Sequence, residues 1–584
     1  MVKIAQNKLL SVITQFILLV PVSTTCFDSS IAHPLPDYDP SHPILRDAFA
    51  HIAALLEITT EDPKYDSSSF SIEITSSKET LWSHHHTARK RNATRPDIPQ
   101  VNGDALYRIA SITKTFTVLA ILQQHESGNL SLDDTVDKYL PGLSQKQNGT
   151  IPWTGITLRS LASQLSGIPR EFGQSDLINA DANSLWKPED LGLPPVSREG
   201  LLQCHEYSPN FKTPCTGDDL LRTVKNLDPI FQPNQQSTYS NLAFEMLGLV
   251  IEKVTNQTYD TYIQDAILTP LGMSKSTLSL PPDSAGVIPL GFHYWDVDEG
   301  VRKPTSGIYT SSSDLSIFLR YVLTHYNDIT PSLNWMNAVS SSLNLNTFYG
   351  MPWEIFQTER ILSESQRNVR FVTKGGGLPG YITQIILMPE YDLGITLLLA
   401  GPLSSLTELI EIVTVHATQA AELYAITELR QFYAGKFVSS DPTLNSSITL
   451  VADHRGLFIE SFISNSTDVL YQLQHAHLVE SGTPRFQLVP TLQYQDADAK
   501  RGSKWRFIPI SDRPFEGPGI WDDFCVADVD KLMYAGRVLN EAIMWRAEDG
   551  ASFNDIELPA YRVKLTRIIA QSESPNEEEE IMEL

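Results

Sequence analysis

The spacing of hydrophobic residues changes character near residue 425, and this change constrains the fold more than any other feature of the chain. Before it, hydrophobic residues recur at helical spacing over Ser111–Gly128 and Leu242–Val254, which predicts two amphipathic helices. Other hydrophobic runs predict strands over Ser69–Glu79, Tyr381–Met388 and Gly394–Leu399. The elements follow no regular strand–helix–strand repeat. Residues 29–425 are therefore predicted to form an α+β domain, an antiparallel sheet flanked by helices.

After this point the sequence consists of short hydrophobic or alternating runs separated by turn residues. The runs are Ile448–Val451, Gly456–Ile463, Phe486–Leu492, Trp505–Ile510 and Leu532–Val538. This pattern predicts a mainly antiparallel β domain over residues 426–570, either a sandwich or a small barrel. Residues 571–584 are acidic and are predicted to be a disordered tail.

Residues 1–25 have the composition of a secretory signal peptide. Lys3 and Lys8 accompany a hydrophobic run over Leu9–Val22, and small residues follow it. The run is shorter than the roughly 20 residues that a membrane span needs. The chain also ends on glutamate-rich sequence instead of a hydrophobic tail, so no membrane anchor is expected. The alternative interpretation of the run is a buried helix at the start of the first domain.

Glycosylation sequons agree with export from the cell. They lie at Asn92, Asn129, Asn148, Asn256, Asn445 and Asn465. The formal net charge of −25 argues against nucleic acid or an anionic membrane as a partner, because both are themselves negatively charged. We therefore expect a secreted glycoprotein. The sequence leaves its oligomeric state open.

Two of the four cysteines lie in a proline-containing stretch between Pro169 and Pro233 that resembles a long insertion. Cys204 and Cys215 are close enough to form a disulfide in an oxidising compartment. Cys26 lies beside the signal peptide, and Cys525 would then be unpaired. Long loops in compact domains are often lids over functional sites. A lid and a surface decoration are both open interpretations of this insertion.

The first motif with chemical meaning is S-x-x-K from Ser111 to Lys114, at the start of a predicted helix. Residues three apart share a helix face, so the two side chains can touch. A serine hydroxyl becomes a good nucleophile when a neighbour takes its proton. A lysine amine can do this when burial or nearby positive charge lowers its pKa. A helix start with an N-cap serine is the alternative for this motif alone.

Two further motifs, taken singly, also allow either a catalytic or a purely structural interpretation. Tyr239-Ser240-Asn241 directly precedes the helix at Leu242 and could supply a proton-exchanging phenol and an orienting amide, or only a helix cap. Lys374–Gly380 (KGGGLPG) could admit a substrate backbone and lend positive charge, or could be a glycine turn. It also fits G-x-G-x-x-G. A strand-like run follows it where dinucleotide binding requires a helix, so no cofactor is expected.

The three motifs in this order resemble those of the serine β-lactamase and penicillin-binding-protein superfamily, in particular the class C β-lactamase, D-Ala-D-Ala carboxypeptidase and esterase branch. The resemblance extends to other segments between about residues 40 and 410. These are Ser131–Val136, Ile156–Leu161, Ser166–Pro169, Pro270–Met273 and Gly307–Leu315. The C-terminal β domain resembles the accessory domain of secreted β-lactamase-related proteins of filamentous fungi.

The resemblance implies a role for each matching residue. Ser111 would be the acylated nucleophile, Lys114 and Tyr239 would share general-base and general-acid work, and Asn241 would orient the substrate. Lys374 would support the tyrosine and bind a substrate carboxylate. The backbone N–H groups of Ser111 and Gly377 would form the oxyanion hole, and Gly376 would line the substrate site. The third motif is K-G-G, so it lacks the hydroxyl of K-T-G that often helps to bind a β-lactam carboxylate.

These observations predict a secreted serine hydrolase that acts on an ester or amide of a small-molecule or peptide-like acyl substrate. An acyltransferase or hydrolase of small-molecule (secondary metabolite) biosynthesis is an alternative, because hydrolysis and transfer differ only in the acceptor. A non-catalytic recognition protein that keeps the fold is a further alternative. No metal site is expected, and His84–His86 are predicted to lie in a solvated loop. The substrate and the purpose of the C-terminal domain are left open.

Overall fold

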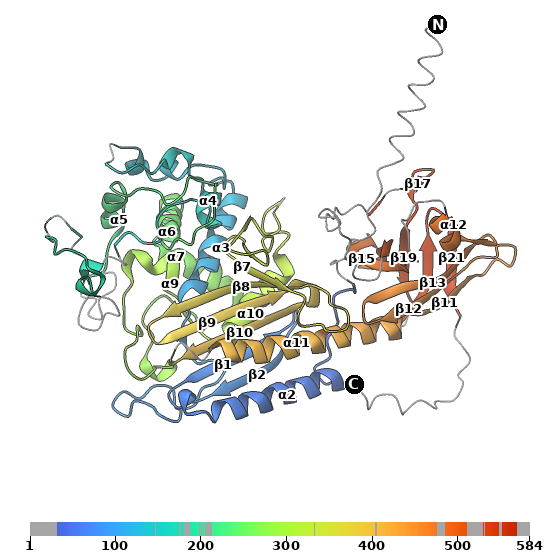
Figure 1. The fold of residues 1–584 in the computed structure, drawn as a ribbon, viewed down its shortest axis with the longest axis horizontal. Coiled ribbons are helices and arrows are strands. Elements are labelled where there is room, and N and C mark those ends of the chain that lie inside the picture. Colours follow the sequence, from blue (N-terminus) through green and yellow to red (C-terminus); the bar gives the residue numbers. More distant parts are fainter. Residues whose placement is uncertain are drawn as a thin grey trace, which may run out of the picture. The chain divides into compact units, whose positions relative to one another are not determined.

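The computed structural model describes residues 32–145, 148–173, 177–179, 187–197, 199, 201–202, 204, 213–331, 333–402, 406–475, 485–510, 529–530, 532–547 and 552–568. The chain divides into two compact units (Figure 1). We call residues 38–361 and 368–420 the sheet domain. The barrel domain takes residues 362–367, those from 421 onward and those before 38. The predicted signal peptide, Cys26, Cys525 and the acidic tail lie outside the described residues.

The sheet domain contains an antiparallel sheet with the strand order β2-β1-β10-β9-β8-β7-β6-β5. Its strands are β1 (Ser69–Thr75), β2 (Thr80–His86), β5 (Ser340–Ser341), β6 (Thr347–Tyr349), β7 (Glu354–Thr358), β8 (Val369–Leu378), β9 (Tyr381–Met388) and β10 (Leu393–Ala400). A separate short ladder joins β3 (Tyr107–Arg108) to β4 (Tyr309–Thr310). The strands β8, β9 and β10 follow one another in sequence and in space, so they form the middle of the sheet by simple hairpin connections.

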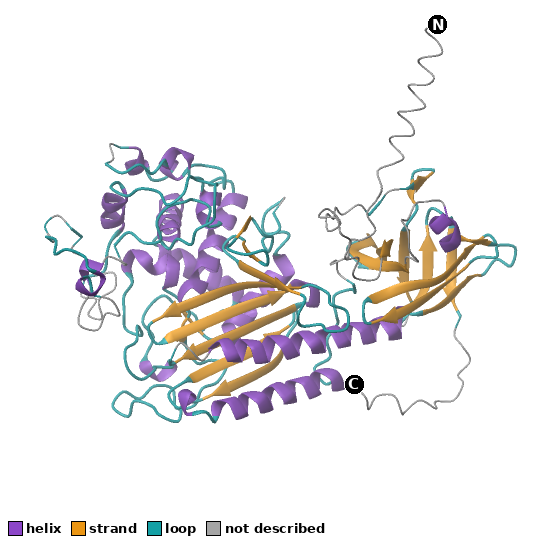
Figure 2. Cartoon of the chain, viewed as in Figure 1, coloured by secondary structure: helices purple, strands orange, loops and turns teal. Residues whose placement is uncertain are grey.

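Helices cover both faces of this sheet and build the region beside it (Figure 2). They are α2 (Pro43–Thr60), α3 (Thr113–Glu126), α4 (Leu158–Ala162), α5 (Gly217–Val224), α6 (Leu242–Thr255), α7 (Tyr259–Ile263), α8 (Thr269–Leu271), α9 (Lys303–Ser306), α10 (Ser312–His325) and α11 (Leu406–Glu428). The helix α11 contains one of the points at which the chain passes from one unit to the other, between Ala420 and Ala421. No helix among the described residues combines the length and the apolar character needed to cross a membrane.

Alternation along β1 explains why helices pack on both faces of the sheet. On one face, Phe70 stacks with His84 and His86 of β2, and Trp82 of that strand stacks with Phe49 of α2. On the other face, Glu73 accepts hydrogen bonds from two serine hydroxyls of α10. Successive side chains of a strand point to opposite faces, so a strand that is buried throughout needs cover on both sides.

The barrel domain is an antiparallel β-barrel. Its strands follow the order β12-β11-β21-β20-β19-β16-β15-β13, and a further pairing of β12 with β13 closes the ring. They are β11 (Gly435–Ser439), β12 (Ser447–Asp453), β13 (Gly456–Ser464), β15 (Arg485–Asp496), β16 (Arg501–Ile510), β19 (Glu541–Arg546), β20 (Phe553–Leu558) and β21 (Val563–Arg567). Closure leaves the ring no free edge strand. Small elements are appended: β14 (Thr467–Asp468), α12 (Val469–His475), β17 (Met533–Tyr534) and β18 (Arg537–Val538).

The predicted architecture is therefore confirmed for both domains, with two local corrections. The strand expected over Ser69–Glu79 ends at Thr75, because Thr75 and Ser76 bond back to Glu79 and turn the chain into β2. The prediction of a solvated loop for His84–His86 is wrong, since all three histidines lie in β2 and are partly buried. Stacking on Phe70 gives His84 and His86 the aromatic neighbour of a sheet surface.

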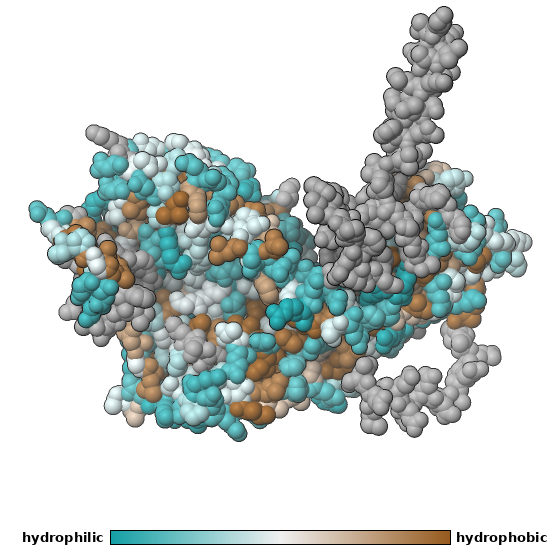
Figure 3. Space-filling view, viewed as in Figure 1, coloured by the Kyte–Doolittle hydropathy of each residue, from teal (hydrophilic) through white to brown (hydrophobic). Residues whose placement is uncertain are grey.

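The predicted disulfide between Cys204 and Cys215 is present, with its Cα atoms 4.9 Å apart. It fastens the insertion immediately before α5, whose first turn is capped reciprocally by Thr216 and Asp219. Hydrophilic and hydrophobic side chains are interspersed on the visible face of the sheet domain (Figure 3).

Candidate active site

The nucleophile predicted from the sequence lies on a strained turn. Ser111 is the middle residue of a single 3-10 turn, Ala110–Ile112, that leads directly into α3. The residue before it, Ala110, is fully buried and has a φ of 50°, a left-handed conformation that alanine rarely adopts. Such strain persists only where the surroundings impose it, and it is often found at functional sites. The turn leaves the Ser111 side chain half-buried, with its hydroxyl at the end of the helix.

Lys114 lies directly beside this hydroxyl. Its Nζ atom donates to Ser111 Oγ at 2.9 Å and to the carbonyl oxygen of Thr305 at 3.2 Å. The lysine is fully buried in the first turn of α3. Burial lowers the pKa of this amine, and the positive charge of Lys374 lowers it further, against the opposing effect of Tyr239. The amine is thus poised to accept a proton from the serine.

The ring of Tyr239 lies among three cationic groups. The Nζ atoms of Lys114 and Lys374 are each 5.2 Å from the ring centroid, and the guanidinium carbon of Arg170 is 4.7 Å from it. Burial raises the pKa of Tyr239, but the charges of the two lysines and a hydrogen bond with Ser111 outweigh it, so the pKa lies below its ordinary value. A phenolate held in this way can exchange a proton with the serine or with a leaving group.

Lys374 has a partner that the sequence analysis did not find. Its Nζ atom donates to Glu354 Oε1 at 2.6 Å and to the carbonyl oxygen of Gly375 at 2.8 Å. The lysine side chain is 1% exposed and the glutamate 34%. Burial alone would lower the pKa of Lys374, but Glu354 and Tyr239 raise it above its ordinary value. The ammonium therefore stays charged, and a carboxylate already binds it.

The glycines after Lys374 bring β8 against the nucleophile turn. A Cβ atom at Gly376 would lie 2.2 Å from the carbonyl oxygen of Ile109 and 3.1 Å from the backbone nitrogen of Ser111. Only glycine permits so close an approach. A Cβ atom at the exposed Gly377 would meet no atom within 4 Å. The ladder between β7 and β8 ends at Thr373, so no described strand pairs with the β7-facing edge of β8 beyond that residue. On this edge the N–H group of Gly375 is taken by Glu354 and its carbonyl oxygen by Lys374, so a substrate backbone could pair with β8 only beyond Gly375.

Asn241 is connected to these residues through Glu171, whose charge acts on Lys114. It immediately precedes α6, and its side-chain amide donates to Glu171 Oε1. Both side chains are buried, and among the described residues Asn241 Oδ1 and Glu171 Oε2 have no hydrogen-bond partner. Burial raises the pKa of Glu171, against the charge of Arg302. The Asn241 oxygen is therefore a buried acceptor whose hydrogen-bonding capacity is unused.

A network of buried ion pairs holds the segment that receives Lys114. Arg108 binds Glu299 at 2.8 Å, and Arg302 lies 3.4 Å from Glu299 and 3.7 Å from Glu245. All four side chains are at most 2% exposed. Arg302 immediately precedes α9, and α9 contains Thr305, whose carbonyl oxygen accepts from Lys114. The network thus holds in place the Thr305 carbonyl oxygen that accepts a hydrogen bond from Lys114.

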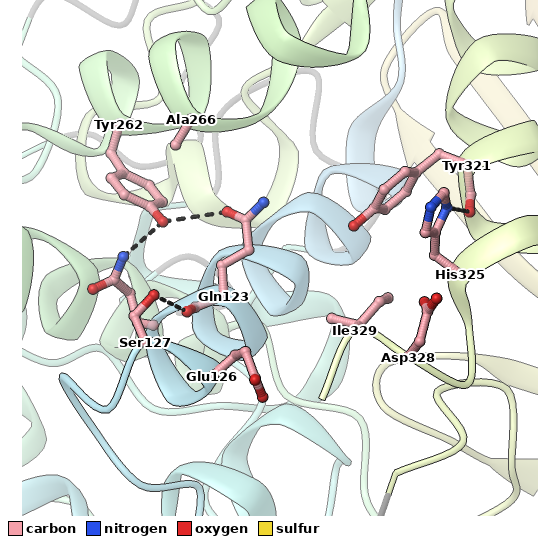
Figure 4. Close-up of a pocket in the computed structure, with 10 residues that line it drawn as sticks. Gln123, Glu126, Ser127, Tyr262, Ala266, Tyr321, His325, Asp328 and Ile329 are labelled. Atoms are coloured by element: carbon pink, nitrogen blue, oxygen red, sulfur yellow. Dashed lines mark hydrogen bonds between the residues drawn. The ribbon is translucent and has the colours of Figure 1, made fainter. Parts of the chain in front are cut away.

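A separate pocket of about 480 Å³ lies at the other end of α3 (Figure 4). Among the residues that line it are Gln123, Glu126, Tyr262, Tyr321 and His325. A helix rises about 1.5 Å per residue, so on the order of 20 Å separates this pocket from Ser111. It contains none of the predicted site residues.

The structure thus brings Ser111, Lys114, Tyr239, Asn241, Lys374 and Gly376 into one site. It adds three residues that the sequence analysis missed: Glu354, Glu171 and Arg170. The last two directly follow Ser166–Pro169, a segment that carried the family resemblance, whereas Glu354 lies in no motif.

The sequon asparagines are exposed at five positions and half-buried at Asn92. Their modification stays a prediction.

Comparisons with known proteins match both domains. The Beta-lactamase family model matches residues 50–411, and a model described as Beta-lactamase-like-like, C-terminal domain, matches residues 425–568. The chain is 30% identical to "Probable hydrolase M10" of Phoma sp., over 92% of this chain and 91% of that protein. It is 30% identical to "Probable hydrolase clz13" of Cochliobolus lunatus, over 93% and 91%. A penicillin-binding protein homologue from Pyrococcus abyssi shares 17% identity, with a TM-score of 0.48 over 89% of this chain and 99% of that one.

Proposed function

Since the chain belongs to the β-lactamase family of serine hydrolases, we propose that it cleaves an ester or amide through an acyl intermediate on Ser111. One observation carries the proposal. The buried amine of Lys114 lies 2.9 Å from Ser111 Oγ, at the hydrogen-bond distance that a general base requires. The names of the two fungal relatives favour hydrolysis over transfer to another acceptor.

In acylation, the Ser111 proton passes to the neutral amine of Lys114 or to the phenolate of Tyr239. Ser111 Oγ then forms a bond to the substrate carbonyl carbon, and the carbonyl becomes an oxyanion. When the oxyanion collapses, the bond to the leaving group breaks and Tyr239 donates to the leaving group the proton taken from Ser111, which reaches the phenolate directly or by way of Lys114. The lowered pKa values of Lys114 and Tyr239 support these proton transfers, because both groups can accept a proton below the pH at which they ordinarily would.

The backbone N–H groups of Ser111 and Gly377 are the proposed donors to the oxyanion. The close approach of Gly376 to the nucleophile turn supports this assignment, because it places the neighbouring stretch of β8 beside Ser111. In deacylation, Tyr239 or Lys114 takes a proton from water as the water oxygen bonds to the ester carbonyl carbon. When the resulting oxyanion collapses, the bond between that carbon and Ser111 Oγ breaks, the carboxylic acid is released, and the proton taken from water passes to Ser111 Oγ. A different nucleophile in place of water would give acyl transfer.

The test compares hydrolysis of p-nitrophenyl butyrate by the full chain and by Ser111→Ala. Removing the nucleophile should lower kcat/KM by about 1,000-fold or more. Ser127→Ala, at the exposed end of the same helix, is the matched control and should retain full activity. Hydrolysis by Ser111→Ala within a few-fold of the unmodified chain would refute the proposal. Tight binding of a substrate analogue without any turnover would favour the non-catalytic alternative.

We further propose that the protein is secreted and glycosylated. The signal-like residues 1–25 and the six sequons support this, as does the Cys204–Cys215 disulfide, since disulfides persist in oxidising compartments. Expression in a eukaryotic host should deliver the protein to the medium without its first residues, and endoglycosidase should lower its mass. Retention inside the cell with an intact N-terminus would contradict this proposal.

A further inference from the structure

The positive charge of Lys374 is already neutralised within the site. In the family that this chain resembles, the corresponding lysine is expected to bind a substrate carboxylate. Here its ammonium lies 2.6 Å from Glu354 Oε1, inside hydrogen-bond distance. A carboxylate that approached the ammonium would also approach the carboxylate of Glu354. The attraction of the substrate carboxylate to Lys374 and its repulsion by Glu354 act over similar distances, so they would largely cancel.

Glu354 is held in place by the sheet, so it cannot easily move aside. It is the first residue of β7 and pairs with Thr373 of β8. The hydroxyl of Thr373 donates to the backbone carbonyl of Glu354 at 2.8 Å. The second carboxylate oxygen of Glu354, Oε2, accepts a hydrogen bond from the backbone N–H of Gly375 at 3.0 Å. Withdrawing the carboxylate would break this bond and the contact with Lys374 together, and would leave a buried ammonium without its partner.

The position that follows Lys374 reinforces this effect. A Cβ atom at Gly375 would lie 3.5 Å from Glu354 Oε2 and 2.9 Å from Gln384 Oε1. A donor hydroxyl at this position would help a substrate carboxylate to bind. This chain instead presents acceptor oxygens there, which repel a carboxylate.

The nearby rim offers apolar contacts. The hairpin of β5 and β6 is tied to the segment before Tyr239 by a hydrogen bond from Ser237 to the carbonyl oxygen of Ser341 at 2.8 Å. The turn of this hairpin carries Leu343 and Leu345, which are 95% and 91% exposed. Exposed leucines on a hairpin tied to the segment before Tyr239 suit an uncharged, apolar group better than a charged one.

We propose that this site takes uncharged acyl substrates, and that Glu354 is the residue that discriminates against substrates with a carboxylate lying against Lys374. The inference rests on the proposed function and names the substrate class of the same site. It separates this chain from an enzyme built for β-lactams or for peptides with a free carboxyl end, because both carry a carboxylate next to the bond that is cleaved.

The experiment compares matched charged and neutral esters. One pair is 3-carboxyphenyl butyrate and 3-carbamoylphenyl butyrate, which differ in the leaving group. The other pair is mono-p-nitrophenyl glutarate and p-nitrophenyl pentanoate, which differ at the end of the acyl chain. The unmodified chain should prefer the neutral ester by about tenfold or more in kcat/KM in at least one pair. Glu354→Gln should narrow that preference by about tenfold, because it frees the charge of Lys374.

Each preference is the ratio of kcat/KM for the neutral ester to kcat/KM for the charged ester, measured on one variant. A general loss of activity lowers both values and leaves their ratio unchanged. Glu57→Gln, an exposed carboxylate on α2, is the matched control and should leave the ratio unchanged. If Glu354→Gln does not fold, the unmodified chain alone can test the inference. High salt should screen the repulsion between Glu354 and the substrate carboxylate and so reduce the preference of the unmodified chain for the neutral ester. Equal rates for charged and neutral esters, or an unchanged ratio in Glu354→Gln, would overturn the inference. Turnover of the neutral esters that does not depend on Ser111 would instead overturn the proposed function.

Discussion

Substituting Gly376 with alanine tests the proposed site geometry, because the effect can be worked out from contacts. The new Cβ atom would lie 2.2 Å from the carbonyl oxygen of Ile109 and 2.5 Å from Thr383 Oγ1. Real Cβ atoms almost never come within 3.0 Å of another heavy atom, so β8 and the nucleophile turn must separate by about 0.8 Å. Overpacking of this kind costs about 1–3 kcal/mol of stability. A misplacement near 1 Å between reacting groups costs about 100-fold in rate.

The assay measures kcat/KM for p-nitrophenyl butyrate together with the thermal midpoint. Gly376→Ala should lose about 100-fold in activity while it remains folded at the assay temperature. Gly142→Ala is the control, because a Cβ atom there meets no atom within 4 Å, and it should behave like the unmodified chain.

A double variant separates the two close contacts. Adding Thr383→Ala to Gly376→Ala removes the side-chain contact but leaves the one with the Ile109 carbonyl oxygen, so it should restore little activity. Activity of Gly376→Ala within threefold of the unmodified chain would refute the claim that β8 and the nucleophile turn together form the site.

Three further predictions follow from the same structure. kcat/KM should rise with pH through an apparent pKa below the ordinary value for a lysine amine, because the neutral amine of Lys114 is the base and burial lowers its pKa. Lys114→Arg should abolish activity at every pH. Removing the Cys204–Cys215 disulfide should cost about 2–3 kcal/mol in urea unfolding, as expected for closing a loop of this length. Glu299→Ala leaves two buried arginines without their shared carboxylate and should cost about 3–5 kcal/mol in the same assay, whereas a loss below 1 kcal/mol would contradict the buried network.

The contact between Ser111 and Lys114 could be anticipated from the sequence, because residues three apart at a helix start share one face. The meeting of these residues with Tyr239 and Lys374 could not be derived from spacing. It came only from resemblance to a family, since more than a hundred residues separate the three motifs.

Glu354 escaped the sequence analysis for a physical reason. It reaches Lys374 through the pairing of β7 with β8, and a lone glutamate at the start of a strand carries no signal of its cross-strand neighbour. Closure of the barrel depends likewise on the pairing of β12 with β13, so the strand pattern alone left sandwich and barrel open. The histidines of β2 were misassigned because three consecutive polar residues suggest a loop, whereas in the strand His84 and His86 stack on Phe70, which offsets the cost of their partial burial.

The most direct test of the account is to trap the acyl-enzyme. The full chain is exposed briefly to p-nitrophenyl butyrate, quenched in acid, and analysed by intact mass and by peptide mapping. The account predicts a mass increase of one butyryl group on the peptide that contains Ser111, and no such increase in Ser111→Ala. A butyryl group on another residue, or turnover that persists in Ser111→Ala, would contradict it.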